Sequence, residues 1–112
     1  MSYRDKKYNT MIVTVEDGIA IVQMNRPEAL NAVNNEMIAE RAEIYEAIAK
    51  DPEIRVMVST GNEQAYCAGG DLKSFVSFGV KEAREFADNV VKTCAIVSDM
   101  NIPTIAMVSG FA

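Results

Sequence analysis

The sequence has no histidine and only two cysteines, Cys67 and Cys94, which do not form a CxxC pair. Zinc sites built from thiolates and imidazoles are therefore excluded for a single chain, as is a serine or cysteine nucleophile paired with a histidine base. Two thiols in so polar a chain are typical of a reducing compartment. The first ten residues lack the apolar core of a secretory signal, and no apolar run approaches the ~20 residues of a membrane span. We therefore expect a cytoplasmic protein with no metal site.

An excess of positive charge is also lacking. Lysine and arginine number 11 against 16 acidic residues, which gives a formal net charge of −5. An acidic surface attracts neither nucleic acid nor an anionic membrane, so neither is expected as a partner. The net charge does not exclude small anionic molecules as ligands, because the local geometry of a site determines whether it binds them. The length of 112 residues suits one domain with a modest core.

Two apolar stretches near the N-terminus predict a β-hairpin. Residues 10–16 (TMIVTVE) and 19–25 (IAIVQMN) have the composition of strands, and Asp17-Gly18 between them is a strong signal for a two-residue turn. Residues 1–9 are charged and without periodicity. We expect those nine residues to form a flexible arm.

Helix and strand patterns alternate after the hairpin. Helices are predicted at residues 35–50, from Leu72, and at residues 81–99, with Asn34 or Asn35 as a cap of the first. Strands are predicted at residues 54–60 and 104–110, whose continuous apolar runs are typical of strands covered on both faces. Each of these strands follows a helical crossover, so parallel β–α–β units and an α/β fold are expected.

Arg41 interrupts the apolar stripe of the first long helix. The other positions on this stripe carry Met37, Ile44, Tyr45 and Ile48. Either the arginine stem lies along the edge of the core with its charge in water, or the helix packs less tightly than the pattern indicates.

The segment AYCAGGDL (residues 65–72) joins a strand to a helix through small residues. The first N–H groups of a helix lack partners within it and favour negative charge, and glycine lets a ligand approach the backbone. Taken alone, the segment is better explained as a tight turn with Asp71 as the helix cap. It is neither a Walker A motif nor a GxGxxG motif.

Three segments together resemble the enoyl-CoA hydratase/isomerase (crotonase) family. They are NRPEALNAV (25–33), AYCAGGDL (65–72) and IPTIAMVSGFA (102–112), in the order and at the spacing of that family. The resemblance implies a crotonase-like (ClpP/crotonase) spiral of ββα units that is incomplete here, with residues 10–112 as the N-terminal portion of the domain. It also implies that the parent protein assembles as a homo-oligomer, a trimer or a hexamer.

The resemblance implies an acyl-CoA thioester as substrate, and no separate cofactor, because CoA is part of the substrate. By this resemblance the backbone N–H of Ala68 is one of two oxyanion-hole donors for the thioester, each worth about 3–4 kcal/mol of transition-state stabilisation. Asp71 is expected mainly as a helix cap. The residues implied in CoA binding are Arg26, Ala29, Leu30, Ala68, Gly69, Gly70, Asp71 and Leu72.

The reaction that the resemblance favours is reversible hydration of a 2-enoyl-CoA. An enoyl-CoA isomerase or a 3-hydroxyacyl-CoA hydrolase would use the same oxyanion hole. The second donor and the catalytic glutamates of the family would follow Ala112, and none of the nearby carboxylates matches them: Glu28, Glu63 and Asp71. The chain ends two residues after an apolar strand, so we expect a piece of a larger domain that is inactive alone. The alternative of another class is a non-catalytic CoA-binding or assembly fragment.

Overall fold

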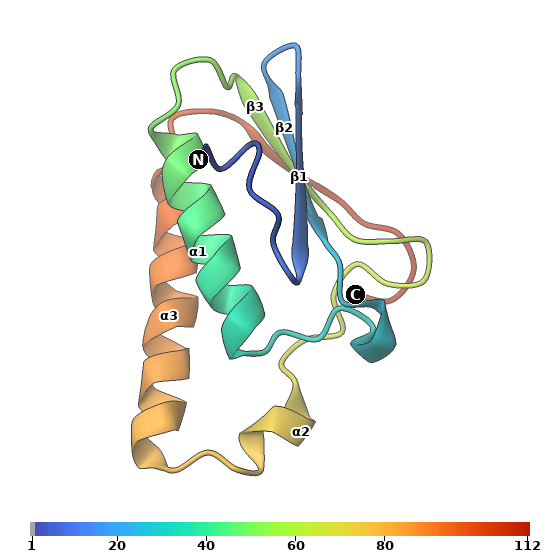
Figure 1. Cartoon of the computed structure of the whole chain (residues 1–112), viewed down its shortest axis with the longest axis vertical. Helices are drawn as coiled ribbons and strands as arrows, with labels where there is room; N and C mark the ends of the chain where they lie inside the picture. Colours follow the sequence, from blue (N-terminus) through green and yellow to red (C-terminus); the bar gives the residue numbers. More distant parts are fainter. Residues whose placement is uncertain (1) are drawn as a thin grey trace.

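A computed structural model describes residues 2–112; Met1, the first residue of the predicted arm, lies outside the described residues. Within residues 2–112 one sheet has the strand order β1-β2-β3-β4: β1 (Met11–Glu16), β2 (Ile19–Met24), β3 (Val56–Thr60) and β4 (Thr104–Met107) (Figure 1). The helices of the same part of the chain are η1 (Pro27–Ala29), α1 (Asn35–Ala49), α2 (Leu72–Phe75) and α3 (Val80–Asp99). None of these helices is both long and apolar enough to cross a membrane.

The predicted hairpin is confirmed. Strands β1 and β2 pair antiparallel, and the last pair before the turn joins Glu16 to Ile19. Asp17 and Gly18 both have positive φ, 52° and 79°. A two-residue turn of this kind needs positive φ at both positions, which aspartate tolerates and glycine adopts freely.

The parallel β–α–β arrangement is confirmed as well. Strand β3 pairs parallel with β2, and β4 pairs parallel with β3. The first crossover contains α1, and the second contains α2 and α3. Asn34 caps α1, because its side chain accepts a hydrogen bond of 2.9 Å from the N–H of Met37.

The hydrophobic core lies between α1 and the first three strands. Its largest buried side chains come from these elements: Met11, Val22, Met24, Met37, Ile38, Ile44, Ile48 and Met57. Full burial of one such side chain contributes about 1.5–3 kcal/mol relative to exposure. This set therefore supplies the main driving force for folding.

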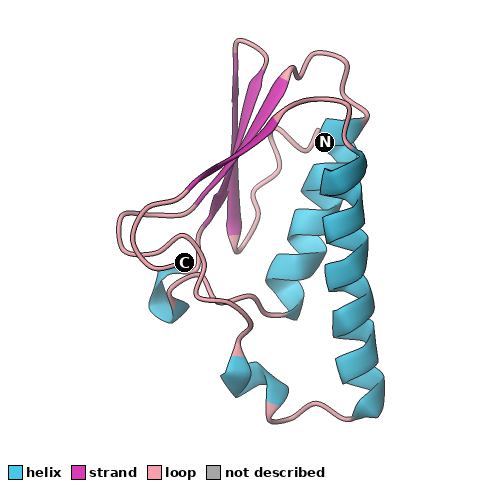
Figure 2. Cartoon of the chain, turned by 180° about the vertical axis from the view of Figure 1, so that it is seen from behind, coloured by secondary structure: helices cyan, strands magenta, loops and turns pink. Residues whose placement is uncertain are grey.

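The expectation that both later strands are covered on two faces is wrong. In β3, Met57 is buried while Val56 and Val58 are half-buried, and every residue of β4 is exposed. Both long helices lie on the same side of the sheet (Figures 1 and 2), which leaves the other side open within the described residues.

The N-terminal segment before β1 lies along α1 and the end of that helix. Lys6 pairs with Glu43 at 2.9 Å, and Arg4 pairs with Asp51 at 2.7 Å. Tyr8 is buried against the core. These contacts give the position of the arm, and its flexibility stays a prediction.

Candidate functional site

Two of the signature segments lie directly against each other. We call residues 25–33 the proline loop and residues 65–72 the glycine loop. Three backbone hydrogen bonds join them: the N–H of Ala68 to the carbonyl of Leu30 (3.1 Å), the N–H of Val33 to the carbonyl of Gly69 (2.7 Å), and the N–H of Asp71 to the carbonyl of Val33 (2.9 Å). Segments far apart in the sequence therefore form one continuous surface.

Asn31 connects the two loops through its side chain, although it was not among the predicted site residues. Its Nδ2 donates to the carbonyls of Ala65 (3.0 Å) and Tyr66 (3.2 Å), and its Oδ1 accepts from the N–H of Arg26 (2.7 Å). The residue is fully buried and has φ of 60°. Asparagine is enriched at such left-handed positions. An asparagine just after the η1 turn was therefore the sequence signal that could have identified this residue.

Arg26 and Asp71 form an ion pair across the same junction. The distance from Nη2 to Oδ2 is 2.8 Å, and Nη1 also donates to the carbonyl of Ala32 at 2.8 Å. The hydrogen bond from Arg26 is the main reason why the pKa of the Asp71 carboxyl is lowered. Asp71 Oδ1 accepts from the N–H of Lys73, so the aspartate also caps α2 as expected. The guanidinium of Arg26, predicted to bind CoA, is thus engaged with protein groups.

The prediction that Ala68 supplies the oxyanion donor disagrees with this geometry. Its N–H already donates to Leu30, and it would have to break that bond to reach a ligand. Among the described residues, the N–H groups of Gly69 and Gly70 have no acceptor. Of these two glycines, only Gly70 lines the neighbouring cavity. The geometry therefore shifts the candidate donor from Ala68 to Gly70.

This cavity, of about 300 Å³, opens between the proline loop and the glycine loop. Five of the predicted residues line it: Ala29, Leu30, Gly70, Asp71 and Leu72. The other lining residues are Glu28, Ala32 and Lys73. Arg26, Ala68 and Gly69 do not line it. Lys73, a cation in the first turn of α2, was not predicted from the sequence.

Space beside the glycine loop is limited on one side. A Cβ added to Gly70 would lie 2.8 Å from the ring of Phe75, so any larger residue requires that ring to move. A Cβ added to Gly69 would meet nothing within 4 Å, but this residue has φ of 103°. Glycine is favoured at position 69 by the backbone and at position 70 by close packing.

The third signature segment reaches the same region. The N–H of Tyr66 donates to the carbonyl of Phe111 at 2.7 Å, and the N–H of Phe111 donates to the carbonyl of Gln64 at 3.0 Å. Figure 1 shows the C-terminus beside this junction. All three segments that carry the family resemblance therefore meet at one end of the sheet.

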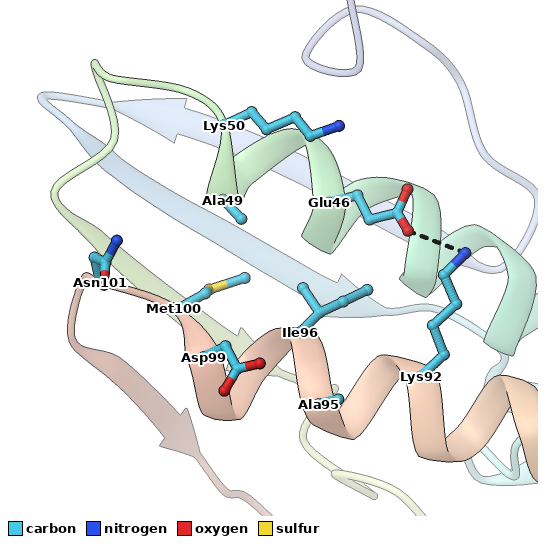
Figure 3. Close-up of a pocket in the computed structure, with 9 residues that line it drawn as sticks. All are labelled: Glu46, Ala49, Lys50, Lys92, Ala95, Ile96, Asp99, Met100 and Asn101. Atoms are coloured by element: carbon cyan, nitrogen blue, oxygen red, sulfur yellow. Dashed lines mark ion pairs between the residues drawn. The ribbon is translucent and has the colours of Figure 1, made fainter.

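A larger cavity, of about 360 Å³, lies elsewhere, between the C-terminal ends of α1 and α3 (Figure 3). An ion pair of 3.0 Å between Glu46 and Lys92 crosses it. None of the predicted site residues lines it. We therefore assign the candidate site to the smaller cavity between the two loops.

The hairpin and the parallel β–α–β units define an α/β protein, and an exposed glycine backbone lies beside its candidate site. The family model for enoyl-CoA hydratase/isomerase matches residues 14–112, and the chain belongs to this family.

Relatives and solved structures agree with this assignment. The chain is 32% identical to a crotonyl-CoA hydratase of Syntrophomonas wolfei over 94% of this chain and 41% of the relative. It is 37% identical to the human enoyl-CoA delta isomerase 2 over 92% of this chain and 27% of that protein. The crystal structure of an enoyl-CoA hydratase from Bacillus anthracis superposes with a TM-score of 0.86 at 25% identity, over 91% of this chain and 40% of that one. The predicted crotonase-like fold is confirmed, and the chain spans about two fifths of these hydratases.

Proposed function

We propose that the protein containing this chain acts on acyl-CoA thioesters and hydrates a 2-enoyl-CoA. Its family and its hydratase relatives support the reaction class. The observation that carries the proposal is the unpaired N–H of Gly70 on the wall of the cavity between the two loops. This is a backbone donor that can bind the carbonyl oxygen of a thioester.

In this proposal the Gly70 N–H donates to the thioester oxygen. When water adds to the β-carbon, negative charge moves onto that oxygen and an enolate forms. The hydrogen bond strengthens as the charge develops, and loss of one such donor typically costs about 3–4 kcal/mol of transition-state stabilisation. Ala68 contributes through its bond to Leu30, which holds the loop.

The rest of the cavity suits the CoA portion of the substrate. Ala29, Leu30 and Leu72 offer apolar contacts to the pantetheine chain, and Lys73 offers a positive charge for a phosphate. Gly69 leaves open space above the backbone. Arg26 then acts as a positioning residue, because its ion pair with Asp71 fixes the glycine loop.

We further propose that the 112-residue chain does not turn over substrate alone. Two carboxylates line the cavity, Glu28 and Asp71. Asp71 is engaged by Arg26 and by the cap of α2, and the Glu28 side chain is 71% exposed. Neither is held as a general base, so glutamates and a second donor from a later segment would complete the site. A homo-trimer or hexamer stays a proposal from the family resemblance, and a cytoplasmic location stays a proposal from the sequence.

Isomerisation of an enoyl-CoA is the second candidate reaction. The relative named enoyl-CoA delta isomerase 2 shares a higher identity with this chain than the hydratase relative does, 37% against 32%. Both reactions pass through a thioester enolate and so use the same donor. They differ in the carboxylates that move protons.

Amide NMR of the ¹⁵N-labelled chain, titrated with crotonyl-CoA, tests the donor assignment. We expect the Gly70 amide proton to move downfield on binding, because it gains a strong acceptor. The Ala68 amide should move little and exchange slowly with deuterium, because Leu30 already occupies it. A larger shift at Ala68 would return the role to that residue, and no shift in either loop would overturn acyl-CoA binding by this chain.

A hydration assay tests the proposed inactivity. The purified chain, free of any longer form, should leave the absorbance of crotonyl-CoA unchanged. Measurable turnover would contradict the proposal that later segments are required.

A further inference from the structure

Arg41 on α1 is a half-buried cation without a carboxylate partner in residues 2–112. Its Nη2 lies 3.0 Å from Met24 Sδ and 3.8 Å from Met37 Sδ. Its Nε is buried and has no hydrogen-bond partner. Thioether sulfur is a weak acceptor, and a buried donor without an acceptor is costly. Because Nε has no exposed surface, an acceptor from outside the described residues would bind the terminal nitrogens of the guanidinium, whose only hydrogen-bond partners within residues 2–112 are the two sulfurs.

A cavity that Arg41 helps to line offers space for such an acceptor. A cavity of about 330 Å³ between α1 and α3 is lined by Arg41, Tyr45, Thr93, Cys94, Val97 and Ser98. The Thr93 hydroxyl already donates to the carbonyl of Asn89 at 2.8 Å. The remaining lining residues with strong donors are therefore Arg41, Ser98 and Tyr45, and Val97 with the Tyr45 ring provides apolar wall.

We propose that this cavity binds a short aliphatic carboxylic acid, with the carboxylate on Arg41 and the chain against Val97 and Tyr45. A guanidinium presents a planar pair of donors that matches the two oxygens of a carboxylate. One positive charge matches a monoanion, and none of the other lining residues is a cation that could offset the second negative charge of a phosphate. The site shares no residue with the cavity between the proline and glycine loops, so the proposal is independent of the proposed function.

A carboxylate on Arg41 could come from a free acid or from an acidic side chain of a second copy of the chain. We assign the cavity to the free acid. Sedimentation of the chain with Arg41 intact and of the variant Arg41→Leu separates the two sources, because only the second requires association. A dimer that Arg41→Leu dissociates, and that hexanoate does not compete with, would overturn the free-acid assignment.

Calorimetric titration with hexanoate is the direct test. We expect binding by the unchanged chain and a loss of about tenfold or more in affinity for Arg41→Leu, since a charge-assisted hydrogen bond is removed. Hexanol, which has the same chain length without the charge, should bind at least about tenfold more weakly than hexanoate. Arg41→Lys should give an intermediate affinity, because it keeps the charge but not the planar pair of donors.

The matched control is Arg84→Leu. Arg84 is an exposed arginine on α3 and does not line this cavity, so its loss changes the net charge equally and should leave hexanoate affinity unchanged. Arg41→Leu should fold, because leucine continues the apolar stripe of α1. The proposal is overturned if hexanoate does not bind, if Arg41→Leu binds it equally well, or if hexanol binds as tightly as hexanoate.

Discussion

Residues 8–65 contain every buried apolar side chain of the described chain, whereas residues 72–112 contain none. Helix α1 buries Ile44, Tyr45 and Ile48 among others, while the one fully buried residue of α3 is Thr93. The difference does not come from composition, because the second region is also apolar: its large exposed side chains include Val80, Val91, Ile105, Met107, Val108 and Phe111.

This contrast separates two properties that a sequence pattern combines. An apolar stripe or run shows that a segment is suited to burial, but it does not show what covers it. In the first region α1 and the sheet cover each other. In the second, β4 is an edge strand with exposed residues throughout, which is a surface that favours association.

The largest test of this contrast compares two isoleucines. Ile44→Ala in α1 should lower the free energy of unfolding by about 2–5 kcal/mol, because it leaves a cavity in the core. Ile105→Ala in β4 removes the same atoms from a residue that is 53% exposed, and should cost less than about 1 kcal/mol. Urea unfolding followed by circular dichroism measures both. Equal losses would show that β4 is covered in solution.

Asn31 tests the junction at which the first region ends. Asn31→Ala should cost about 2–3 kcal/mol, because it removes the hydrogen bonds to the carbonyls of Ala65 and Tyr66 in a buried place. Asn31→Gly is the matched control, since glycine adopts the positive φ without strain. The difference between the two variants measures the backbone strain of alanine. A loss confined to Asn31→Ala would mean that the side-chain hydrogen bonds contribute little.

Much of the fold follows from local chemistry. Asp17-Gly18 specifies the hairpin turn, and Asn34 caps α1 where the sequence places the cap. The apolar stripe of α1 identified four of the residues that this helix contributes to the core: Met37, Ile44, Tyr45 and Ile48. The class and the order of elements could therefore be predicted, because each depends on residues close together in the chain.

The details of the site depend on contacts between distant segments. Whether a backbone N–H is free cannot be read from a motif: Ala68 and Gly70 lie in the same loop, and only the position of the Leu30 carbonyl distinguishes them. The ion pair of Arg26 with Asp71 likewise requires that the two loops meet. The family resemblance assigned the donor to Ala68, whose N–H is occupied by the Leu30 carbonyl.

The ion pair of Arg26 with Asp71 should make stability depend on pH. The pKa of Asp71 is lowered in the folded chain, so its ionised form adds stability above the ordinary carboxyl value of about 3.9. That contribution is lost as the pH falls through the lowered pKa of the folded state. Asp71→Asn should therefore reduce the melting temperature at neutral pH and reduce it less at acid pH.

Thermal melts across this pH range measure the effect as the difference between the variant and the unchanged chain. Asp88→Asn, at an exposed position of α3, is the control for general charge effects. The melting temperatures of the two variants should differ at pH values above the carboxyl pKa range and become similar below it. Parallel curves would mean that the ion pair adds no stability to the fold.

The smallest expected effect is at Val91, which is 68% exposed on α3. Val91→Ser should change the free energy of unfolding by no more than about 0.5 kcal/mol, as is usual for surface positions. The measurement should be made at several protein concentrations, because association through the exposed apolar face would make the melting temperature rise with concentration. A concentration-dependent melt that Val91→Ser abolishes would show that a second copy covers α3. The contrast between the two regions would then be a property of the monomer and not of the associated form.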